Sequence, residues 1–323
     1  MPQFAWLCSH ESYQPEVLID QAVAAEKAGF EMVTASDHFH PWVDDNSAAG
    51  FVWSWLGAAA ARTEGVRLVT SVTCPLFHYH PALVAQAAAT VSRLSEGRFI
   101  LGVGTGENIN EGPLGYEFPG YGERIRRMRE ALEIMTRLLA GEKLDFEGRY
   151  YTCHKAKLYS PPLGRVPIWM AAGGEQSATF AGKNSEGIIT SVKDPADTVS
   201  NIIKPFQEAH GRHGTVMATR WVILAASPDE AWQALGSMRG LRAPGRLEEV
   251  DPMVLRERAD AMDREEILGK YTVVADAAGL IDAYRPLTTD VGADVVSIQV
   301  ASTDPNHAIN LIGSEVLPEL RKL

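Results

Sequence analysis

The sequence predicts a (β/α)8 barrel formed by a single domain, residues 1–323. Two observations lead to this fold. Eight short apolar runs alternate with helical patterns or polar stretches along the chain. The chain of 323 residues is also long enough for one such barrel with insertions. The alternative that the pattern leaves open is a doubly wound open sheet.

The order of the elements follows from periodicity and from helix start and stop signals. Pro15 opens an apolar-periodic helix and Gly29 ends it, which predicts a helix over 15–30. Further helices are expected at 51–63, 80–95 and 121–141. The expected strands are 4–8, 31–36, 66–73, 98–106, 166–174, 186–191, 219–227 and 293–302. Insertions are expected in two places. The pattern around 142–165 is typical of short strands and turns, and the segment around 228–270 is a long polar stretch.

Composition restricts the classes of partner. A net charge of −11 disfavours nucleic acid, because no basic surplus neutralises phosphates. The three cysteines form no paired framework and are expected to be reduced thiols of a cytoplasmic protein. The N-terminus lacks the pattern of a signal peptide, and no apolar run reaches the roughly 18 to 20 residues of a membrane span. A small-molecule substrate is therefore expected.

Polar side chains follow several of the expected strands at their C-terminal ends. Barrel enzymes place their sites at this end, so these side chains predict a ligand site at the barrel mouth. The segments that carry them are "TASDHFHPW" (34–42), "GVGTGENINEG" (102–112), "AAGG" (171–174) and "TSVKD" (190–194). The candidate residues are Asp37, His38, His40, Trp42, Glu107, Asn110, Glu111, Gly173, Gly174 and Lys193.

These motifs allow two other interpretations. The His38-x-His40 spacing can hold a metal, but a closed site needs further ligands, and no later histidine clearly follows a strand end. We therefore expect no metal. The "GVGTGE" segment fails as a dinucleotide fingerprint because Glu107 stands where the third glycine is required. Its glycines are better explained by close approach of the backbone to a ligand.

These motifs together give the chain a family resemblance. With "SDHFHPW", "WSWLGAAAART", "TSVTCP", "GVGTGENINE" and "AAGG" in this order, it resembles the luciferase-like flavin and deazaflavin oxidoreductases. Within them it is similar to the dehydrogenases that use the deazaflavin coenzyme F420, acting on glucose 6-phosphate or secondary alcohols. The resemblance covers nearly the whole chain. It implies coenzyme F420 as cofactor, a homodimer, and a non-prolyl cis peptide at Ser71-Val72.

The resemblance also assigns roles to residues of matching type. His38 is the base on the reacting hydroxyl, Trp42 stabilises the transition state or walls the substrate, and Glu107 lies near N1 of the coenzyme. A histidine that titrates near neutrality suits removal of a hydroxyl proton as hydride leaves. The positions that correspond to coenzyme contacts are Asp37, Ser71, Val72, Thr73, Gly106, Asn110, Ala171, Ala172, Gly173 and Gly174.

Substrate identity depends on three basic positions. In the sugar-phosphate members three cations bind the phosphate, and the matching positions here are Lys193, Arg246 and Lys270. Leu247 stands where the glucose-6-phosphate enzymes have a histidine. The leading hypothesis is oxidation of the C1 hydroxyl of a sugar 6-phosphate. The alternatives are an F420-dependent secondary-alcohol dehydrogenase, an FMN-dependent monooxygenase and a non-catalytic cofactor-binding barrel.

Overall fold

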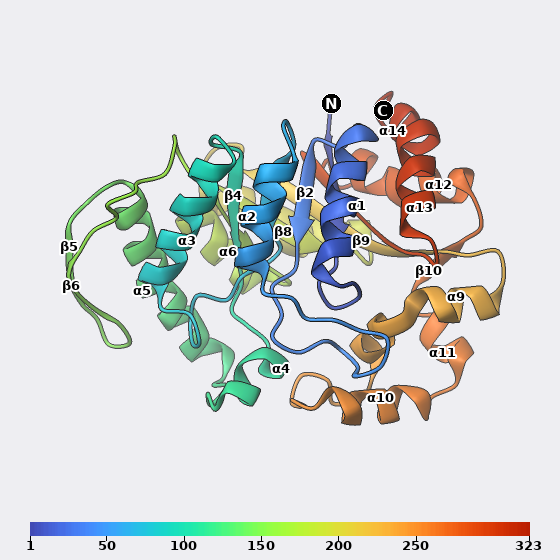
Figure 1. The fold of residues 1–323 in the computed structure, drawn as a ribbon, viewed down its shortest axis with the longest axis horizontal. Coiled ribbons are helices and arrows are strands. Elements are labelled where there is room, and N and C mark those ends of the chain that lie inside the picture. Colours follow the sequence, from blue (N-terminus) through green and yellow to red (C-terminus); the bar gives the residue numbers. More distant parts are fainter.

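Eight parallel strands close into a barrel in the computed structural model, which describes residues 1–323 (Figure 1). Neighbouring strands pair in chain order around the ring, and β8 pairs with β9 as well as with β7. This closed arrangement confirms the predicted barrel over the open sheet. The barrel strands are β1 (Gln3–Cys8), β2 (Met32–Ala35), β3 (Arg67–Thr70), β4 (Phe99–Val103), β7 (Ile168–Ala171), β8 (Gly187–Ser191), β9 (Thr215–Leu224) and β11 (Val295–Ala301).

The seventh barrel strand differs most from its predicted bounds. The apolar run predicts a strand over 219–227, whereas β9 begins at Thr215 and ends at Leu224. The earlier start has a tertiary cause, because residues 215–219 of β9 pair with 187–191 of β8 and so close the ring. Pairing across the closure, rather than the hydrophobicity of the segment, sets this boundary.

Helices cover the outside of the barrel (Figure 1). Proline occupies the first helical position of both α1 and α3, where its missing N–H costs nothing. Gly29 adopts a φ of 91° just after α1, as the predicted helix stop requires. No helix in the structure has the length and apolarity that crossing a bilayer demands. The helices between and after the strands are α1 (Pro15–Lys27), α2 (Val52–Arg62), α3 (Pro81–Leu94), α4 (Asn108–Glu111), α5 (Tyr121–Leu139), α6 (Glu175–Asn184), α7 (Pro195–Thr198), α8 (Lys204–His210), α12 (Ala277–Thr289), α13 (Pro305–Leu311) and α14 (Leu317–Leu320).

Two excursions leave the barrel where the sequence predicts insertions. The first is an antiparallel hairpin of β5 (Leu144–Glu147) and β6 (Thr152–Ala156). The second is mostly helical and lies with α4 at the end toward which the β2 arrow points (Figure 1). A small apolar cluster that includes Trp42 and Leu255 fixes this second excursion to the barrel mouth. Its elements are α9 (Pro228–Leu235), the 3₁₀ helix η3 (Gly236–Arg242), α10 (Pro252–Asp260), α11 (Arg264–Leu268) and β10 (Thr272–Val274).

One apolar layer of side chains crosses the inside of the barrel. Each of the eight strands contributes a single buried residue to this layer, so it seals the barrel below the mouth. A ligand at the C-terminal end therefore rests on a packed floor. The layer consists of Ala5, Met32, Val69, Ile100, Trp169, Ile189, Met217 and Val295.

Gly102 in β4 provides a stability prediction. A Cβ added there would lie 1.9 Å from the backbone oxygen of Thr70, which the β3–β4 pairing holds in place. We expect Gly102→Ala to lower the free energy of unfolding by about 2–4 kcal/mol. Urea denaturation followed by circular dichroism measures this change. Gly122→Ala in α5 is the control, because its Cβ would meet only the mobile Arg126 side chain at 3.7 Å; equal stability of both variants would contradict the prediction.

Candidate active site

A cavity of about 920 Å³ opens at the C-terminal ends of the barrel strands. Thirteen of the sixteen residues to which the resemblance gives a role line it, from five different strand ends and the second excursion: Asp37, His38, Trp42, Ser71, Val72, Gly106, Glu107, Asn110, Ala171, Ala172, Gly173, Lys193 and Arg246. Three others are not in its lining. Thr73 is buried behind Asp37, and Gly174 is the N-cap of α6. Lys270 forms an ion pair with Glu266 on α11, 2.9 Å away.

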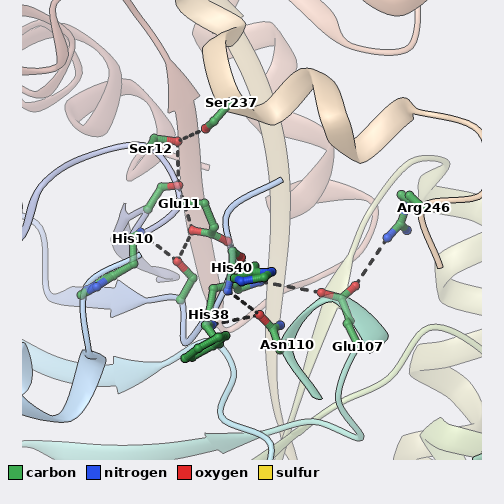
Figure 2. A network of polar contacts seen from close by, with 12 residues as sticks. His10, Glu11, Ser12, His38, His40, Glu107, Asn110, Ser237 and Arg246 are labelled. Carbon is green, nitrogen blue, oxygen red and sulfur yellow. Dashed lines mark hydrogen bonds and ion pairs between the residues drawn. The ribbon is translucent and has the colours of Figure 1, made fainter. Parts of the chain in front are cut away.

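His38 is held at the cavity by both ring nitrogens. Its Nδ1 lies 3.1 Å from the backbone oxygen of His40. A carbonyl only accepts, so Nδ1 carries a proton and Nε2 is the basic nitrogen of the neutral ring. Nε2 lies 3.2 Å from Oε1 of Glu11 and 3.7 Å from Oε2 of Glu107 (Figure 2). The basic nitrogen therefore lies between two carboxylates.

The charges around His38 shift its pKa. Burial alone lowers the pKa of His38, but the carboxylates of Glu11 and Glu107 outweigh it and raise the pKa above its ordinary value. Burial acts on Glu11 in the opposite sense, yet the charge of His38 and a hydrogen bond from the Ser36 hydroxyl leave the pKa of Glu11 below its ordinary value. When His38 is protonated, the two groups therefore form a buried ion pair in which each favours the charged form of the other.

Glu11 is a residue of the cavity that the sequence analysis missed. It is 5% exposed, follows β1 and lines the cavity. The hydroxyls of Ser9 and Ser36 both donate to its Oε2. The segment "CSHES" could have identified it. Polar residues directly follow the first strand there, as they follow the later strands that carry the predicted site residues.

Asp37 is anchored next to His38. Its carboxylate accepts hydrogen bonds from Thr73 at 2.7 Å and from Tyr79 at 3.4 Å. Burial raises the pKa of Asp37, and the hydrogen bond from Thr73 partly opposes this rise. Thr73 therefore supports the site from behind, which explains why it lies outside the cavity lining.

Trp42, Glu107 and Arg246 form the wall opposite Glu11. The rings of His38 and Trp42 meet edge to face with centroids 5.2 Å apart. Arg246 lies over the Trp42 ring at 5.5 Å and contacts Oε1 of Glu107 at 3.5 Å (Figure 2). This places a cation, from the second excursion, beside two of the predicted catalytic side chains.

Hydrogen bonds hold the loop after β2 against its neighbours. Oδ1 of Asn110 accepts from the backbone N–H of Phe39 at 2.9 Å and of His40 at 3.4 Å. Nδ1 of His40 contacts the backbone oxygen of Val250 at 3.0 Å, so His40 points to the second excursion rather than to His38. The two histidines do not converge, and no group of three metal-ligating side chains occurs in the structure.

Glycines shape the surface for a flat ligand. A Cβ on Gly104 would lie 2.5 Å from the Val72 side chain, so this strand end packs directly on Val72. A Cβ on Gly173 or Gly174 would meet nothing within 4 Å. The packing of the chain itself does not require glycine at 173, and a glycine in the cavity lining lets a ligand approach the backbone closely. The peptide Ser71-Val72 is cis, as the resemblance predicted.

A positive end of the cavity suits an anionic group. Arg124 lines the cavity and stacks at 4.4 Å on the ring of Phe118. Tyr121 and Ser177 line the cavity beside it, and Ser177 belongs to the first turn of α6. The residues present therefore fit a deazaflavin coenzyme, with a glycine-lined slot for its ring and a cationic region for an acidic tail.

Arg242 is a further cation of the cavity that the sequence analysis did not predict. Arg242, at the end of η3, lines the cavity with Lys193 and Arg246. Its guanidinium stacks on the ring of Tyr271 at 4.6 Å and forms no ion pair, and its Nε is buried without a hydrogen-bond partner. Lys193 likewise forms no ion pair. Lys193, Arg242 and Arg246 form a cation cluster in the cavity lining, whereas Lys270 is not part of that lining.

Comparison with known proteins places the chain in a family. Residues 3–289 match the family described as luciferase-like monooxygenase. The chain belongs to the luciferase-like monooxygenase family. Among curated members, it is 35% identical to the F420-dependent glucose-6-phosphate dehydrogenase of Intrasporangium calvum, with 100% of both chains covered. It is also 35% identical to the F420-dependent hydroxymycolic acid dehydrogenase of Mycobacterium tuberculosis, over 97% of this chain and 87% of that protein.

A solved structure shares the fold of this chain closely. The F420-dependent secondary alcohol dehydrogenase in complex with an F420-acetone adduct superposes with a TM-score of 0.92 at 31% identity. The match covers 99% of this chain and 100% of that chain. The predicted luciferase-like barrel and the predicted family are therefore both confirmed.

Proposed function

We propose that this protein is a coenzyme F420-dependent dehydrogenase that oxidises the C1 hydroxyl of a sugar 6-phosphate. The observation that carries the proposal is that one cavity combines a proton acceptor with a cation cluster. His38 is the proton acceptor, and Lys193, Arg242 and Arg246 are the cations. The curated relatives at 35% identity named F420-dependent glucose-6-phosphate dehydrogenase support the same activity.

The residues of the chain supply proton handling and orientation. When bound, coenzyme F420 supplies a hydride acceptor at C5 of its deazaflavin ring. Nε2 of His38 accepts the proton of the substrate hydroxyl while hydride leaves the carbon atom that carries this hydroxyl. The carboxylate of Glu11 stabilises the imidazolium that forms, and the backbone oxygen of His40 fixes the ring orientation. The indole of Trp42 packs against His38 and closes the substrate side.

The residues that would hold the coenzyme belong to four strand ends. Asp37 and Val72 contact one part of the ring slot, and Gly106, Ala171, Ala172 and Gly173 line the rest. Glu107 is the acid expected near N1, where a carboxyl group can supply or accept a proton. Arg124 is the cation available to an acidic tail.

The cation cluster yields a test of the substrate class. Lys193→Ala and Arg242→Ala are each expected to raise KM for a sugar 6-phosphate about tenfold, because each removes a charge-assisted hydrogen bond. Neither should change kcat by more than about twofold, since the phosphate is remote from the reacting carbon. Steady-state kinetics with a panel of sugar 6-phosphates measures both constants.

Lys270→Ala is the matched control, because its amino group pairs with Glu266 outside the cavity. Its KM should equal that of the wild type. Unchanged KM in Lys193→Ala and Arg242→Ala would remove the sugar-phosphate proposal. A raised KM in Lys270→Ala alone would restore the phosphate site that the sequence predicts.

A second candidate substrate is a secondary alcohol. Apolar side chains of Trp221, Met238 and Leu241 line the same cavity. The solved relative at 31% identity is a secondary alcohol dehydrogenase. The deciding experiment follows the visible absorbance of oxidised coenzyme F420 mixed with the protein and either sugar 6-phosphates or small secondary alcohols. Bleaching with one group selects that substrate class; no binding of the coenzyme would favour FMN and the monooxygenase alternative.

A homodimer in the cytoplasm completes the proposal. The resemblance to F420-dependent dehydrogenases is its support. Light scattering coupled to size-exclusion chromatography measures the mass in solution, and a monomer mass of 35.2 kDa would contradict the dimer.

A further inference from the structure

A second cavity of about 290 Å³ adjoins the active-site cavity. Leu7, Trp221 and Met238 line both cavities and so form the partition between them. Half of the residues that line the second cavity are polar or glycine, and the other half are hydrophobic. Gln21 is 1% exposed, and its Nε2 is buried without a protein partner. A buried amide of this kind is normally hydrogen-bonded, and a cavity of this size accommodates water.

Three serine hydroxyls connect this second cavity to the active site. Oγ of Ser237 lies 3.0 Å from Oγ of Ser12, which lies 3.0 Å from Oγ of Ser9. The Ser9 hydroxyl lies 3.1 Å from Oε2 of Glu11, whose Oε1 lies 3.2 Å from Nε2 of His38 (Figure 2). All three serines line the second cavity. The chain of contacts is therefore continuous from the basic nitrogen of His38 to the second cavity.

The hydroxyls have a defined direction when Glu11 is ionised. A carboxylate only accepts, so Ser9 donates to Glu11. Ser12 then donates to Ser9, and Ser237 donates to Ser12, because each hydroxyl has one proton. Every proton in the chain points toward Glu11, which is the arrangement needed to deliver a proton or, after each hydroxyl turns, to remove one.

Such a path would serve catalysis, given the proposed dehydrogenase function on which this inference rests. The side chain of His38 is only 10% exposed, and it lines the cavity that coenzyme and substrate fill. A proton taken from the substrate is thereby separated from bulk water by the bound reactants. While the reactants are bound, His38 can lose that proton only by a route that avoids them.

We propose that Glu11, Ser9, Ser12 and Ser237 form a proton relay between His38 and the second cavity. In alcohol oxidation the substrate O–H bond breaks and the Nε2–H bond of His38 forms. That proton passes to Oε1 of Glu11, and a half-turn of the carboxyl group presents it to Ser9. Ser9, Ser12 and Ser237 each accept one proton and release their own, so one proton reaches water in the second cavity. No electron moves along the relay, and carbonyl reduction uses the same steps in reverse.

The test uses Ser12→Ala, Ser237→Ala and the double variant of the full-length protein with coenzyme F420. Each single variant is expected to lower kcat about tenfold, with KM within about twofold and a larger solvent deuterium isotope effect on kcat. Because the two hydroxyls act in series, the double variant should lose no more than either single variant. Ser12→Thr keeps a hydroxyl at a half-buried position and should restore most of the rate.

Two controls separate a relay from a structural defect. Thr303→Ala alters the same cavity outside the chain of contacts and should leave kcat unchanged. The pKa of His38, measured by NMR without coenzyme, should be the same in Ser12→Ala as in the wild type, because Ser12 contacts neither His38 nor Glu11. Unchanged kcat in the single variants, an unchanged isotope effect, or losses that multiply in the double variant would each overturn the relay. A wild type that oxidises no alcohol would instead overturn the proposed function and the relay with it.

Discussion

His38→Ala is expected to lower kcat for alcohol oxidation by roughly 10²–10⁴-fold, because it removes the acceptor of the hydroxyl proton. The affinity for coenzyme F420 should change little. The glycine-lined slot and Arg124 remain, and the ring of His38 mainly contacts Glu11, Glu107 and Trp42. Stopped-flow bleaching of the coenzyme measures the rate, and fluorescence titration measures the affinity.

His40→Ala is the matched control for this prediction. Its imidazole contacts the backbone of Val250, and only its backbone oxygen holds His38, so the substitution leaves that contact in place. A much smaller loss of rate is expected. Full turnover by His38→Ala, or a loss explained entirely by weaker coenzyme binding, would refute the assignment of His38 as the base.

Glu11→Gln is expected to move the pH profile of alcohol oxidation. Oxidation needs the neutral ring of His38, so its rate falls as pH decreases through the pKa of His38. The Glu11 carboxylate helps to raise that pKa, so its loss lowers the pKa and shifts the acidic limb of kcat/KM to lower pH. The plateau value of kcat should also fall roughly 10–100-fold, because the imidazolium loses its counter-charge and its proton outlet. Carbonyl reduction needs the imidazolium form of His38. The alkaline limb of its pH–rate profile should therefore move to lower pH in Glu11→Gln.

The measurement is kcat and kcat/KM as a function of pH for Glu11→Gln, for Ser36→Ala and for the wild type. Ser36→Ala provides a comparison, because it removes one hydrogen bond to Glu11 and keeps the charge. It should raise the pKa of Glu11 and shift the His38 limb less than Glu11→Gln does. An acidic limb that stays in place in Glu11→Gln would show that Glu11 does not control the protonation of His38.

Much of the candidate site was predictable because it lies at strand ends. Each polar motif follows an apolar run, and a closed parallel barrel brings all such ends to one mouth. Asp37, His38 and Glu107 could therefore be assigned to one site without any contact information. Glu11 was missed although it follows β1 in the same way, because the importance of a lone glutamate depends on its distance from His38.

The second excursion was the least predictable region of the site. Lys270 was predicted as a phosphate contact, but it lies at the end of α11 and pairs with Glu266. Arg242 was not predicted, yet it lines the cavity. Helices in an insertion have no fixed relation to the strand ends, so only their packing through the cluster around Trp42 and Leu255 decides which cations face the cavity.

The sequence by itself determined the barrel, the family and the chemistry-bearing residues of the strand ends. The hydrophobic period, the turn residues and the order of the motifs can be read directly from the sequence. The barrel then brings the strand ends that carry these motifs together at one mouth. Only the tertiary structure decided which side chains meet. It pairs Glu11 with His38, places Arg242 but not Lys270 in the cavity lining, and connects the serine hydroxyls between Glu11 and the second cavity. The reason is physical, since hydrogen bonds and charge pairs depend on distances of about 3 Å between atoms that lie far apart in the chain.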